Sequence, residues 1–399
     1  MYKKNSLFGM PSHVVFCKKC VISNQLPNST VEFKSKNTKN KESIEIDKGI
    51  CSACEYANKK NKINWNLREQ KLKNLLNKHR KTIGYDVVVP GSGGKDSAYT
   101  AHILKYKYGM NPLTVTWAPH LYTDIGWQNF TNWSHVGGLD NLLFTPNGKI
   151  HRKATELAFK NLGHPFQPFI IGQKLIAPKI AAKFNIPLIM YGENPAEYGN
   201  KIEENKDPKM DNSFFGSNDI RNIYLGGVSV KKMISKYKFN LNEFEPYIPL
   251  EKKEINQKKL EFHFLGYYLK WDPQECYYYS FNNTGFKPNY ERTEGSYSKY
   301  SSIDDKIDFF HYYTTYIKFG LGRASYDASQ EIRNEKITRA EGISLVKKFD
   351  HEFPHKYFTE FLDYVNCTED EFIKIIDKYR SPHLWHKKKG KWILKQKIY

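Results

Sequence analysis

A glycine-rich turn that joins an apolar run to a helical pattern is the feature that most restricts the fold of this chain. Residues 85–90 (YDVVVP) have the pattern of a short buried strand, residues 91–94 (GSGG) that of a tight turn, and residues 96–105 that of a helix. Strand patterns at 113–117, 141–144 and 186–190 then alternate with helical patterns at 151–162 and 174–184. This alternation predicts an α/β fold in which helices cover both faces of a parallel sheet.

The segments around this core have weaker patterns. Residues 63–80 space their apolar side chains as a helix does, whereas residues 200–259 are charged and rich in asparagine, so we expect an irregular insertion or lid there. Residues 262–271 are expected to form the last strand of the sheet. Thr338 and Thr368 each precede a glutamate by three residues, the pattern of a capping box, which predicts two helix starts in a helical C-terminal part.

Four of the six cysteines form two close pairs with thirty residues between them. The pairs are Cys17-x-x-Cys20 and Cys51-x-x-Cys54. Two such pairs can supply the four thiolates of a tetrahedral zinc site, which would fold a module whose own core is small. Two disulfides, unrelated free thiols, and a redox or iron–sulfur role remain alternatives. Cys276 and Cys367 stand alone and are expected to be small buried residues.

The chain is strongly basic, with 62 Lys and Arg against 42 Asp and Glu and a formal net charge of +20. Only nine of the cations are arginines, the residue that base and phosphate recognition favours, so the charge does not favour nucleic acid as a partner. We expect instead a basic cleft for small anions. The first residues lack the apolar core of a signal peptide, and no run reaches the roughly 18 apolar residues of a membrane span, so we expect a soluble, cytoplasmic protein.

The turn itself has the residues of an anion cradle. Glycines allow the backbone to approach an anion, the first N–H groups of the helix point at it, and a lysine and serines complete the contacts. A Walker A loop is excluded, because position 89 is Val and Asp96 replaces the Ser/Thr that follows the lysine. The run resembles the loop of the PP-loop ATP pyrophosphatases, which cleave ATP between its α and β phosphates. This resemblance implies that ATP is bound by Ser92, Gly93, Gly94, Lys95, Asp96 and Ser97, with its adenine at the backbone of Thr116, Trp117 and Ala118.

A second cluster of polar residues directly follows the strand at 186–190. Ligands of open α/β sheets bind beyond the carboxyl ends of the strands, so these residues are expected near the same edge. The cluster contains Gly192, Glu193, Asn194, Glu197 and Tyr198. Its carboxylates and amide suit Mg²⁺ coordination or hydrogen bonds to a substrate. A surface loop with chance acidic residues is the alternative.

Several motifs together resemble the N-acetyl sugar amidotransferase family, whose members convert an acetamido group of a bacterial surface sugar, such as pseudaminic acid or an O-antigen sugar, to an acetamidino group. The similarity extends from Cys17 to about Trp385. The motifs are the cysteine pairs, Pro90–Ser97, Tyr122–Trp127, Thr145–Gly148, Tyr191–Pro195, Gly266-Tyr-Tyr, Trp271-Asp-Pro, Asp304-Asp305 and Lys318–Asp327. The resemblance implies a zinc-binding module at 1–62, a Rossmann-like PP-loop ATP-binding domain at 63–275 and a helical domain at 276–399.

The resemblance also implies a reaction. The acetamido oxygen would attack the α-phosphate of ATP to give an adenylated imidate and pyrophosphate, and ammonia would then displace AMP. Lys95 and Mg²⁺ would stabilise the phosphate charge, with Asp96 and Glu193 as further catalytic residues. For Asp96 the alternative is capping of the helix that begins there.

Ammonia must come from elsewhere, because none of the cysteines lies in a glutaminase elbow and position 2 is Tyr rather than a nucleophilic cysteine. The resemblance implies a separate glutaminase paired with a synthase-like barrel subunit of the histidine-pathway type, which would channel the ammonia.

A cluster of charged residues in the C-terminal part is a candidate for binding the carboxylate of an acidic sugar. It comprises Lys318, Arg323, Asp327 and Arg333, and guanidinium groups offer a bidentate fork for such a group. Salt bridges on a helix surface are the alternative. For the whole chain the competing function is that of a PP-loop tRNA-modifying enzyme that adenylates or thiolates a base, for which only Cys276 offers a catalytic thiol.

Overall fold

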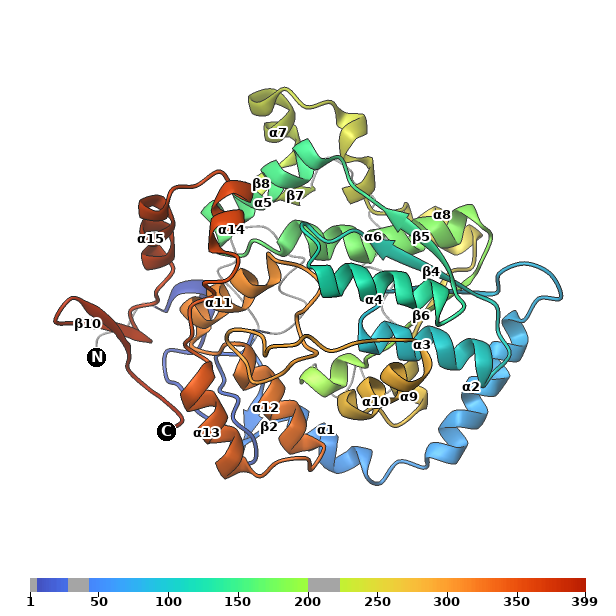
Figure 1. Ribbon diagram of the computed structural model, residues 1–399, viewed down its shortest axis with the longest axis horizontal. Helices are drawn as coiled ribbons and strands as arrows, with labels where there is room; N and C mark the ends of the chain where they lie inside the picture. The colour runs from blue at the N-terminus through green and yellow to red at the C-terminus, as the bar shows by residue number, and fades with distance from the viewer. Residues whose placement is uncertain (1–5, 28–42, 200–222) are drawn as a thin grey trace.

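The structure is a computed structural model that describes residues 6–27, 43–199 and 223–399 (Figure 1). Its largest sheet has five parallel strands in the order β5-β4-β3-β6-β9. In chain order these are β3 (Val87–Pro90), β4 (Pro112–Trp117), β5 (Asp140–Phe144), β6 (Leu188–Tyr191) and β9 (Glu261–Phe264). The predicted α/β class with a parallel sheet is therefore confirmed.

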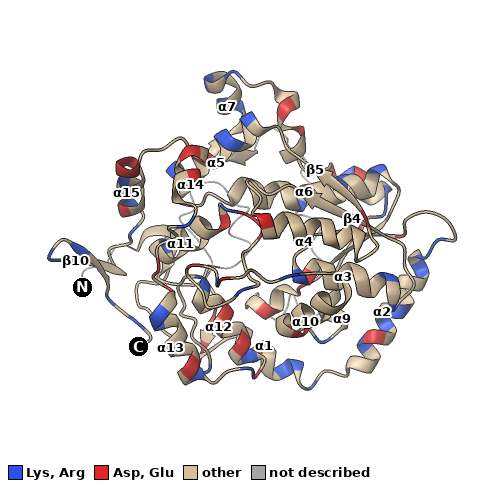
Figure 2. Cartoon of the chain, in the orientation of Figure 1, with Lys and Arg blue, Asp and Glu red and all other residues tan. Residues whose placement is uncertain are grey.

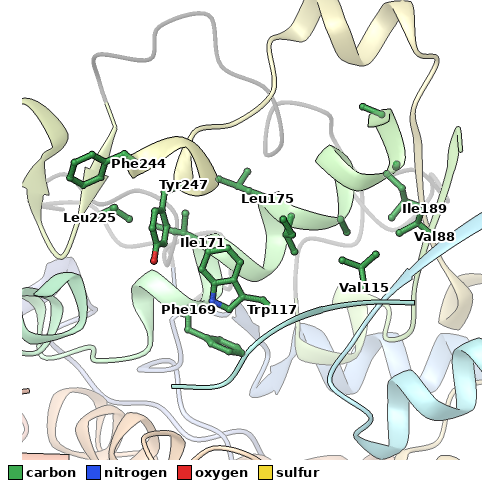
Figure 3. Packing of buried hydrophobic residues seen from close by; sticks show 14 of the residues in the cluster. Val88, Val115, Trp117, Phe169, Ile171, Leu175, Ile189, Leu225, Phe244 and Tyr247 are labelled. Carbon is green, nitrogen blue, oxygen red and sulfur yellow. The ribbon is translucent and has the colours of Figure 1, made fainter. Parts of the chain in front are cut away.

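Helices cover both faces of this sheet, and the strand residues alternate between two apolar clusters. Val88 and Ile189 lie in one cluster with α5 (Gly148–Leu162) and α6 (Gln167–Lys183). Val87 and Val89 lie in the other, with α2 (Trp65–His79) and α3 (Lys95–Tyr106). The alternation is the two-residue period of a strand whose two faces are both buried. Figure 3 shows the first cluster, in which Trp117 packs against Tyr247 with 5.3 Å between the ring centres.

The expected irregular insertion at 200–259 is wrong for its second half; residues 200–222 lie outside the described residues. The elements after them are β7 (Tyr224–Leu225), β8 (Val228–Ser229), α7 (Val230–Tyr237), the 3-10 helix Leu241–Tyr247 and α8 (Lys252–Gln257). Leu225, Met233, Phe244 and Tyr247 of this segment are buried in the first apolar cluster. Sequence periodicity did not predict these elements because each is short and has few apolar residues, some of which pack against α5 and α6.

The last strand of the sheet is present but shorter than the expected 262–271. It ends at Phe264 and passes into the short helix α9 (Leu265–Tyr268). Gly266 N–H donates to the Gly192 carbonyl over 2.9 Å, so the chain turns here to contact the loop that follows β6. Tyr267 and Tyr268 at this turn are helical, although aromatic residues favour strands.

The N-terminal part contains the two-stranded β1 (Ile46–Asp47) and β2 (Ile50–Cys51), followed by α1 (Ser52–Lys60). After the sheet, α10 (Pro273–Asn283) packs on α3. Residues 284–307 come next. They are followed by α11 (Asp308–Phe319), α12 (Arg323–Arg333), α13 (Arg339–Phe349), α14 (Phe358–Tyr364) and α15 (Glu369–Lys378). Earlier in the chain, helix α4 (Asp124–His135) lies between β4 and β5.

Both predicted capping boxes are confirmed. The hydroxyls of Thr338 and Thr368 accept from the N–H groups of Glu341 and Glu371, whose carboxylates accept in return from the threonine N–H groups. The chain then ends in a hairpin of β10 (Trp385–Lys388) and β11 (Lys391–Leu394), which the sequence analysis did not predict. Among the described helices, none has the length and apolarity needed to cross a membrane.

Candidate active site

The glycine-rich turn is a tight loop between β3 and α3, and two of its glycines are required by close contacts. Gly93 has φ +81°, and a Cβ on it would lie 2.8 Å from the backbone of Phe130 in α4. A Cβ on Gly91 would lie 2.1 Å from the Cβ of Ser97. The loop is therefore folded back on the first turn of α3 and held under α4. The first-turn N–H groups of a helix have no partner within it, so those of Lys95, Asp96 and Ser97 remain available for a ligand.

Lys95 and Asp96 lie at the start of α3 and form an ion pair. Burial alone would lower the pKa of Lys95, but the carboxylates of Asp96 and Glu193 outweigh it and raise that pKa. Asp96 is inside the first turn, whereas the N-cap position is taken by Gly94, so the capping alternative for Asp96 is wrong. Its Oδ1 atom is buried and has no hydrogen-bond partner among the described residues. A buried carboxylate oxygen without a partner suits a metal ion or a protonated ligand.

Glu193 and Tyr198 come from the loop after β6 and are hydrogen-bonded to each other. Burial and the nearby Asp96 carboxylate raise the pKa of Glu193 to about 7, although Lys95 acts in the opposite direction. Glu193 can therefore exchange a proton near neutral pH, as a general acid or base must. The 3-10 helix Pro195–Tyr198 begins in this loop and is capped by Asn194, whose Oδ1 accepts from Ala196 N–H over 3.1 Å.

These side chains share a cavity of about 190 Å³ with residues of the C-terminal part. The walls come from the first turn of α3, the loop after β6, residues 272–274 and 298–301, and the face of α12 with its following turn. The lining residues are Lys95, Asp96, Glu193, Tyr198, Asp272, Pro273, Gln274, Ser298, Tyr300, Ser301, Tyr312, Arg323, Tyr326, Asp327, Gln330, Glu331, Asn334 and Lys336. Five of them are acidic and three are basic, so the expected basic cleft is wrong for the described lining of this cavity.

The wall formed by α12 contains two of the predicted substrate residues. Arg323 pairs with Asp327 over 3.1 Å, and its guanidinium carbon lies 4.4 Å from the centre of the Tyr312 ring. Burial would lower the pKa of Arg323, but Asp327 and the other acidic groups around it raise that pKa. Arg323 and Asp327 thus form a salt bridge along a helix, which was the alternative interpretation. They also line the cavity, as predicted for substrate-binding residues.

Other predicted residues lie away from this cavity. Glu197 forms a buried ion pair with Lys60 over 2.8 Å. The guanidinium Nη2 of Arg333 donates to the Glu197 carbonyl over 3.0 Å, so Arg333 is not aimed at a sugar carboxylate in the cavity. Lys318 does not line the cavity: it donates to the Leu162 carbonyl over 2.9 Å, and its ammonium lies near the rings of Phe8 and Phe319.

The predicted adenine residues lie at the end of β4. Trp117 is 1% exposed and stacks on Phe144, with 5.1 Å between the ring centres. Its side chain is part of the core (Figure 3). The Thr116 hydroxyl accepts from Asn141 over 2.9 Å. Neither residue lines the cavity described above, so only their backbone is left as a contact for a base.

The remaining predicted loop residues have structural contacts. Ser92 is hydrogen-bonded to Asp304, and Ser97 Oγ donates to the Gly94 carbonyl over 3.0 Å. Gly192 is tightly packed, because a Cβ there would lie 2.9 Å from both Thr100 and the Trp271 ring. Cys276 is buried close to Lys95 and Asp96, and burial together with the Asp96 carboxylate raises the pKa of its thiol well above the usual value, although Lys95 acts in the opposite direction.

The cavity contains residues that the sequence analysis did not select. Gln330, Glu331 and Asn334 follow Arg323 at spacings of seven, eight and eleven residues, which is one face of a helix. Helical periodicity starting from Arg323 could have identified them. Tyr300 and Ser301 come from an irregular segment and have no such signal.

The four paired cysteines meet in one cluster, as predicted. Their Sγ atoms all lie within 4.8 Å of one another, and all four residues are buried. Cys17 and Cys54 are separated by 3.9 Å between sulfurs, and Cys20 and Cys51 by 3.6 Å. A tetrahedral zinc site with Zn–S bonds of about 2.3 Å has sulfurs about 3.8 Å apart, so the donor set fits zinc. The six cysteines are free thiols, which excludes the alternative of two disulfides in this structure.

Comparison with known families gives one match. Residues 294–399 match the model of the LPS biosynthesis protein WbpG-like, C-terminal domain. No curated protein matches the chain. The matched segment contains α11 and α12 and thus one wall of the cavity, including Tyr300, Arg323 and Asp327. This part of the chain is therefore similar to the C-terminal domain of an LPS biosynthesis protein.

Proposed function

We propose that the protein is an ATP-dependent amidotransferase that converts an acetamido group of a bacterial surface sugar to an acetamidino group. One observation carries the proposal: a single cavity joins Lys95 and Asp96 of the anion-binding loop to α12, within the segment similar to the WbpG-like domain. A loop that we propose to bind phosphate and a segment similar to a lipopolysaccharide biosynthesis domain therefore face the same space.

The phosphates would lie at the α3 end of the cavity. The first-turn N–H groups of α3 and the ammonium of Lys95 are the donors there, and they favour charge that develops on a transferring phosphoryl group. Mg²⁺ would be held by Asp96, whose Oδ1 has no partner among the described residues. When bound, the ion would neutralise phosphate charge.

The sugar would lie against α12. This wall has amide and carboxylate side chains at Gln330, Glu331 and Asn334, together with the aromatic rings of Tyr300 and Tyr326. Such groups accept and donate hydrogen bonds with sugar hydroxyls. Arg323 is the remaining candidate for a sugar carboxylate. The cavity is smaller than the roughly 300–1,000 Å³ of typical ligand pockets, so we assign to it only the reacting groups of the two substrates.

The chemistry needs an activated amide oxygen. The acetamido oxygen attacks the α-phosphorus of ATP, its P–O bond forms as the bond to pyrophosphate breaks, and the product is an adenylated imidate. Ammonia then adds to the imidate carbon, and AMP leaves with the former acetamido oxygen. A proton must leave the nitrogen in the second step, and Glu193, with a pKa of about 7, is a suitable acceptor.

The ammonia source is part of the same proposal. We propose a separate glutaminase with a synthase-like channelling subunit as the partner. The described residues include no cysteine in a glutaminase constellation: the four clustered thiols face one another, and Cys276 is buried beside Lys95.

The direct test is AMP formation with purified protein, ATP, Mg²⁺ and ammonium. One reaction receives an acetamido-sugar pool from bacterial surface-polysaccharide synthesis, a second receives bulk tRNA, and a third receives neither. The proposal expects AMP and pyrophosphate in equal amounts only with the sugar, together with a sugar product about one mass unit lighter. AMP that requires tRNA would instead establish the competing tRNA-modifying function.

A further inference from the structure

Helix α1 connects the four-cysteine cluster to the candidate active site. Its N-terminal end carries two of the cluster's thiols, Cys51 at the N-cap and Cys54 in the first turn. Its last residue is Lys60, nine residues from Cys51 along a helix about 13 Å long. The helix is therefore fixed to the cysteine cluster at its N-terminal end. A shift of the cluster would move Lys60 and the residues that Lys60 contacts.

Lys60 contacts three separate segments that border the cavity. Its ammonium pairs with Glu197 over 2.8 Å, donates to the Trp271 carbonyl, and donates to Asn334 Oδ1 over 3.2 Å. Glu197 belongs to the loop that supplies Glu193 and Tyr198, Trp271 precedes the lining residue Asp272, and Asn334 itself lines the cavity. Both side chains of the Lys60–Glu197 pair are less than 8% exposed.

A second set of contacts joins the cysteine cluster to the opposite wall. Arg333 ends α12 and donates to the Glu197 carbonyl over 3.0 Å. Arg339 begins α13 and donates over 3.2 Å to the carbonyls of Cys17 and Cys20. The backbone of the first cysteine pair therefore supports the α12–α13 turn, while the second pair supports α1.

The loop after β6 is also fixed directly by the start of α1. Ser52 Oγ donates to the Gly199 carbonyl over 2.7 Å, and Tyr56 accepts from Asn194 Nδ2 over 3.3 Å. The loop that supplies Glu193 and Tyr198 thus rests on α1 along most of its length. Buried ion pairs and hydrogen bonds of this kind fix geometry more than they add stability.

We propose that the four-cysteine module sets the spacing between the two walls of the cavity, and that Lys60 is the positioning residue through which it acts on the Glu193–Tyr198 loop. The inference uses the proposed function only in taking the cavity as the active site. Lys60 and Glu197 do not line the cavity, so their role is exerted through Glu193, Asp272 and Asn334.

The test uses the full-length chain with the substitutions Lys60→Met and Glu197→Gln together. Both are made because removal of Lys60 alone would leave an unpaired buried carboxylate, which can prevent folding. Lys59→Met is the matched control, since Lys59 is the exposed neighbour on the same helix. Metal content, hydrogen exchange of residues 193–199 and the binding of a non-hydrolysable ATP analogue with Mg²⁺ are measured for each protein.

We expect the double variant to keep its metal and its overall melting transition, while amide exchange in residues 193–199 becomes about tenfold faster than in the control, as expected for a local opening. Removal of the metal from the wild-type protein by a chelator should accelerate exchange in the same segment. The two effects should not add, because both act through α1. Binding of the ATP analogue should weaken in the double variant and not in the control.

Unchanged exchange at 193–199 in the double variant, or exchange effects of chelation and substitution that add independently, would overturn the inference. The result is separable from the proposed function. If exchange behaves as expected but the protein makes no AMP with any sugar, the coupling stands and only the assignment of the reaction fails.

Discussion

Substitution of Glu193 by glutamine should stabilise the protein at neutral and alkaline pH and leave its stability nearly unchanged at pH 4.5. Burial and the neighbouring Asp96 raise the pKa of Glu193 in the folded protein from 4.5 to about 7. The folded state therefore holds this proton more tightly than the unfolded state does. Below pH 4.5 the carboxyl is protonated in both states, so it carries no penalty; as pH rises to 7, the folded state loses stability relative to the unfolded state.

The size of the effect follows from the shift. Each pKa unit corresponds to about 1.4 kcal/mol, so a shift from 4.5 to about 7 gives at most about 3 kcal/mol of destabilisation above pH 7. Glutamine has nearly the same shape and can still accept the hydrogen bond from Tyr198, but it has no charge to lose or gain. The free energy of unfolding of the variant should therefore exceed that of the wild type by most of this penalty at high pH. The difference should grow between pH 4.5 and 7 and stay constant above pH 7.

The assay is urea denaturation at several pH values between 4.5 and 8.5, with the free energy of unfolding extrapolated to water. Glu335→Gln is the control, because Glu335 is exposed on the turn after α12. A Glu193→Gln variant that is no more stable than the wild type at pH 8, or whose gain is as large at pH 4.5 as at pH 8, would refute the reasoning. Under the proposed function Glu193 accepts a proton, so AMP formation by the wild type should rise with pH through about 7, and the variant should lack this rise.

Four further outcomes are expected. Lys95→Ala and Asp96→Ala should each lower AMP formation by about 10²–10³-fold with little change in melting temperature, as measured by pyrophosphate release and circular dichroism. Cys51→Ser should reduce bound zinc and unfold at lower urea, since a structural site contributes its binding energy to folding; a metal-free variant that stays fully folded but inactive would contradict a structural role. The isolated protein should use ammonium salts well and glutamine poorly, as measured by product mass. Calorimetry should detect binding of an ATP analogue with Mg²⁺ and much weaker binding with EDTA.

The sheet and the cysteine cluster were predictable because their signals are local. A four-residue apolar strand, a glycine turn and a helix start adjoin one another at 87–106, and two Cys-x-x-Cys turns each fix two sulfurs. The capping boxes at Thr338 and Thr368 are equally local, and each gives the observed helix boundary. In each case the residues that decide the structure lie within a few positions of one another.

The candidate site was predictable only in part, because its second wall depends on which face of α12 meets the sheet. Arg323 and Asp327 are one turn apart and share a face, so both reach the cavity. Arg333 is ten residues from Arg323, and its side chain leaves the helix toward Glu197 and the cysteine cluster. The prediction grouped Arg323, Asp327 and Arg333 by their closeness in sequence, and it did not distinguish the different faces of the helix.

The net charge of +20 describes the outer surface and not the cavity. In Figure 2 the Lys and Arg residues lie on separate elements, among them α2, α7 and the β10–β11 hairpin. The cavity lining among the described residues is formally −2, with Lys95, Arg323 and Lys336 against five carboxylates. A triphosphate entering such a cavity would meet repulsion unless cations or protons accompany it. The raised pKa of Glu193 supplies one proton, and Mg²⁺ at Asp96 would supply the larger part. Under the proposed function, the acidic lining therefore suits an anionic substrate that arrives with its metal, rather than the binding of polyanions by charge alone.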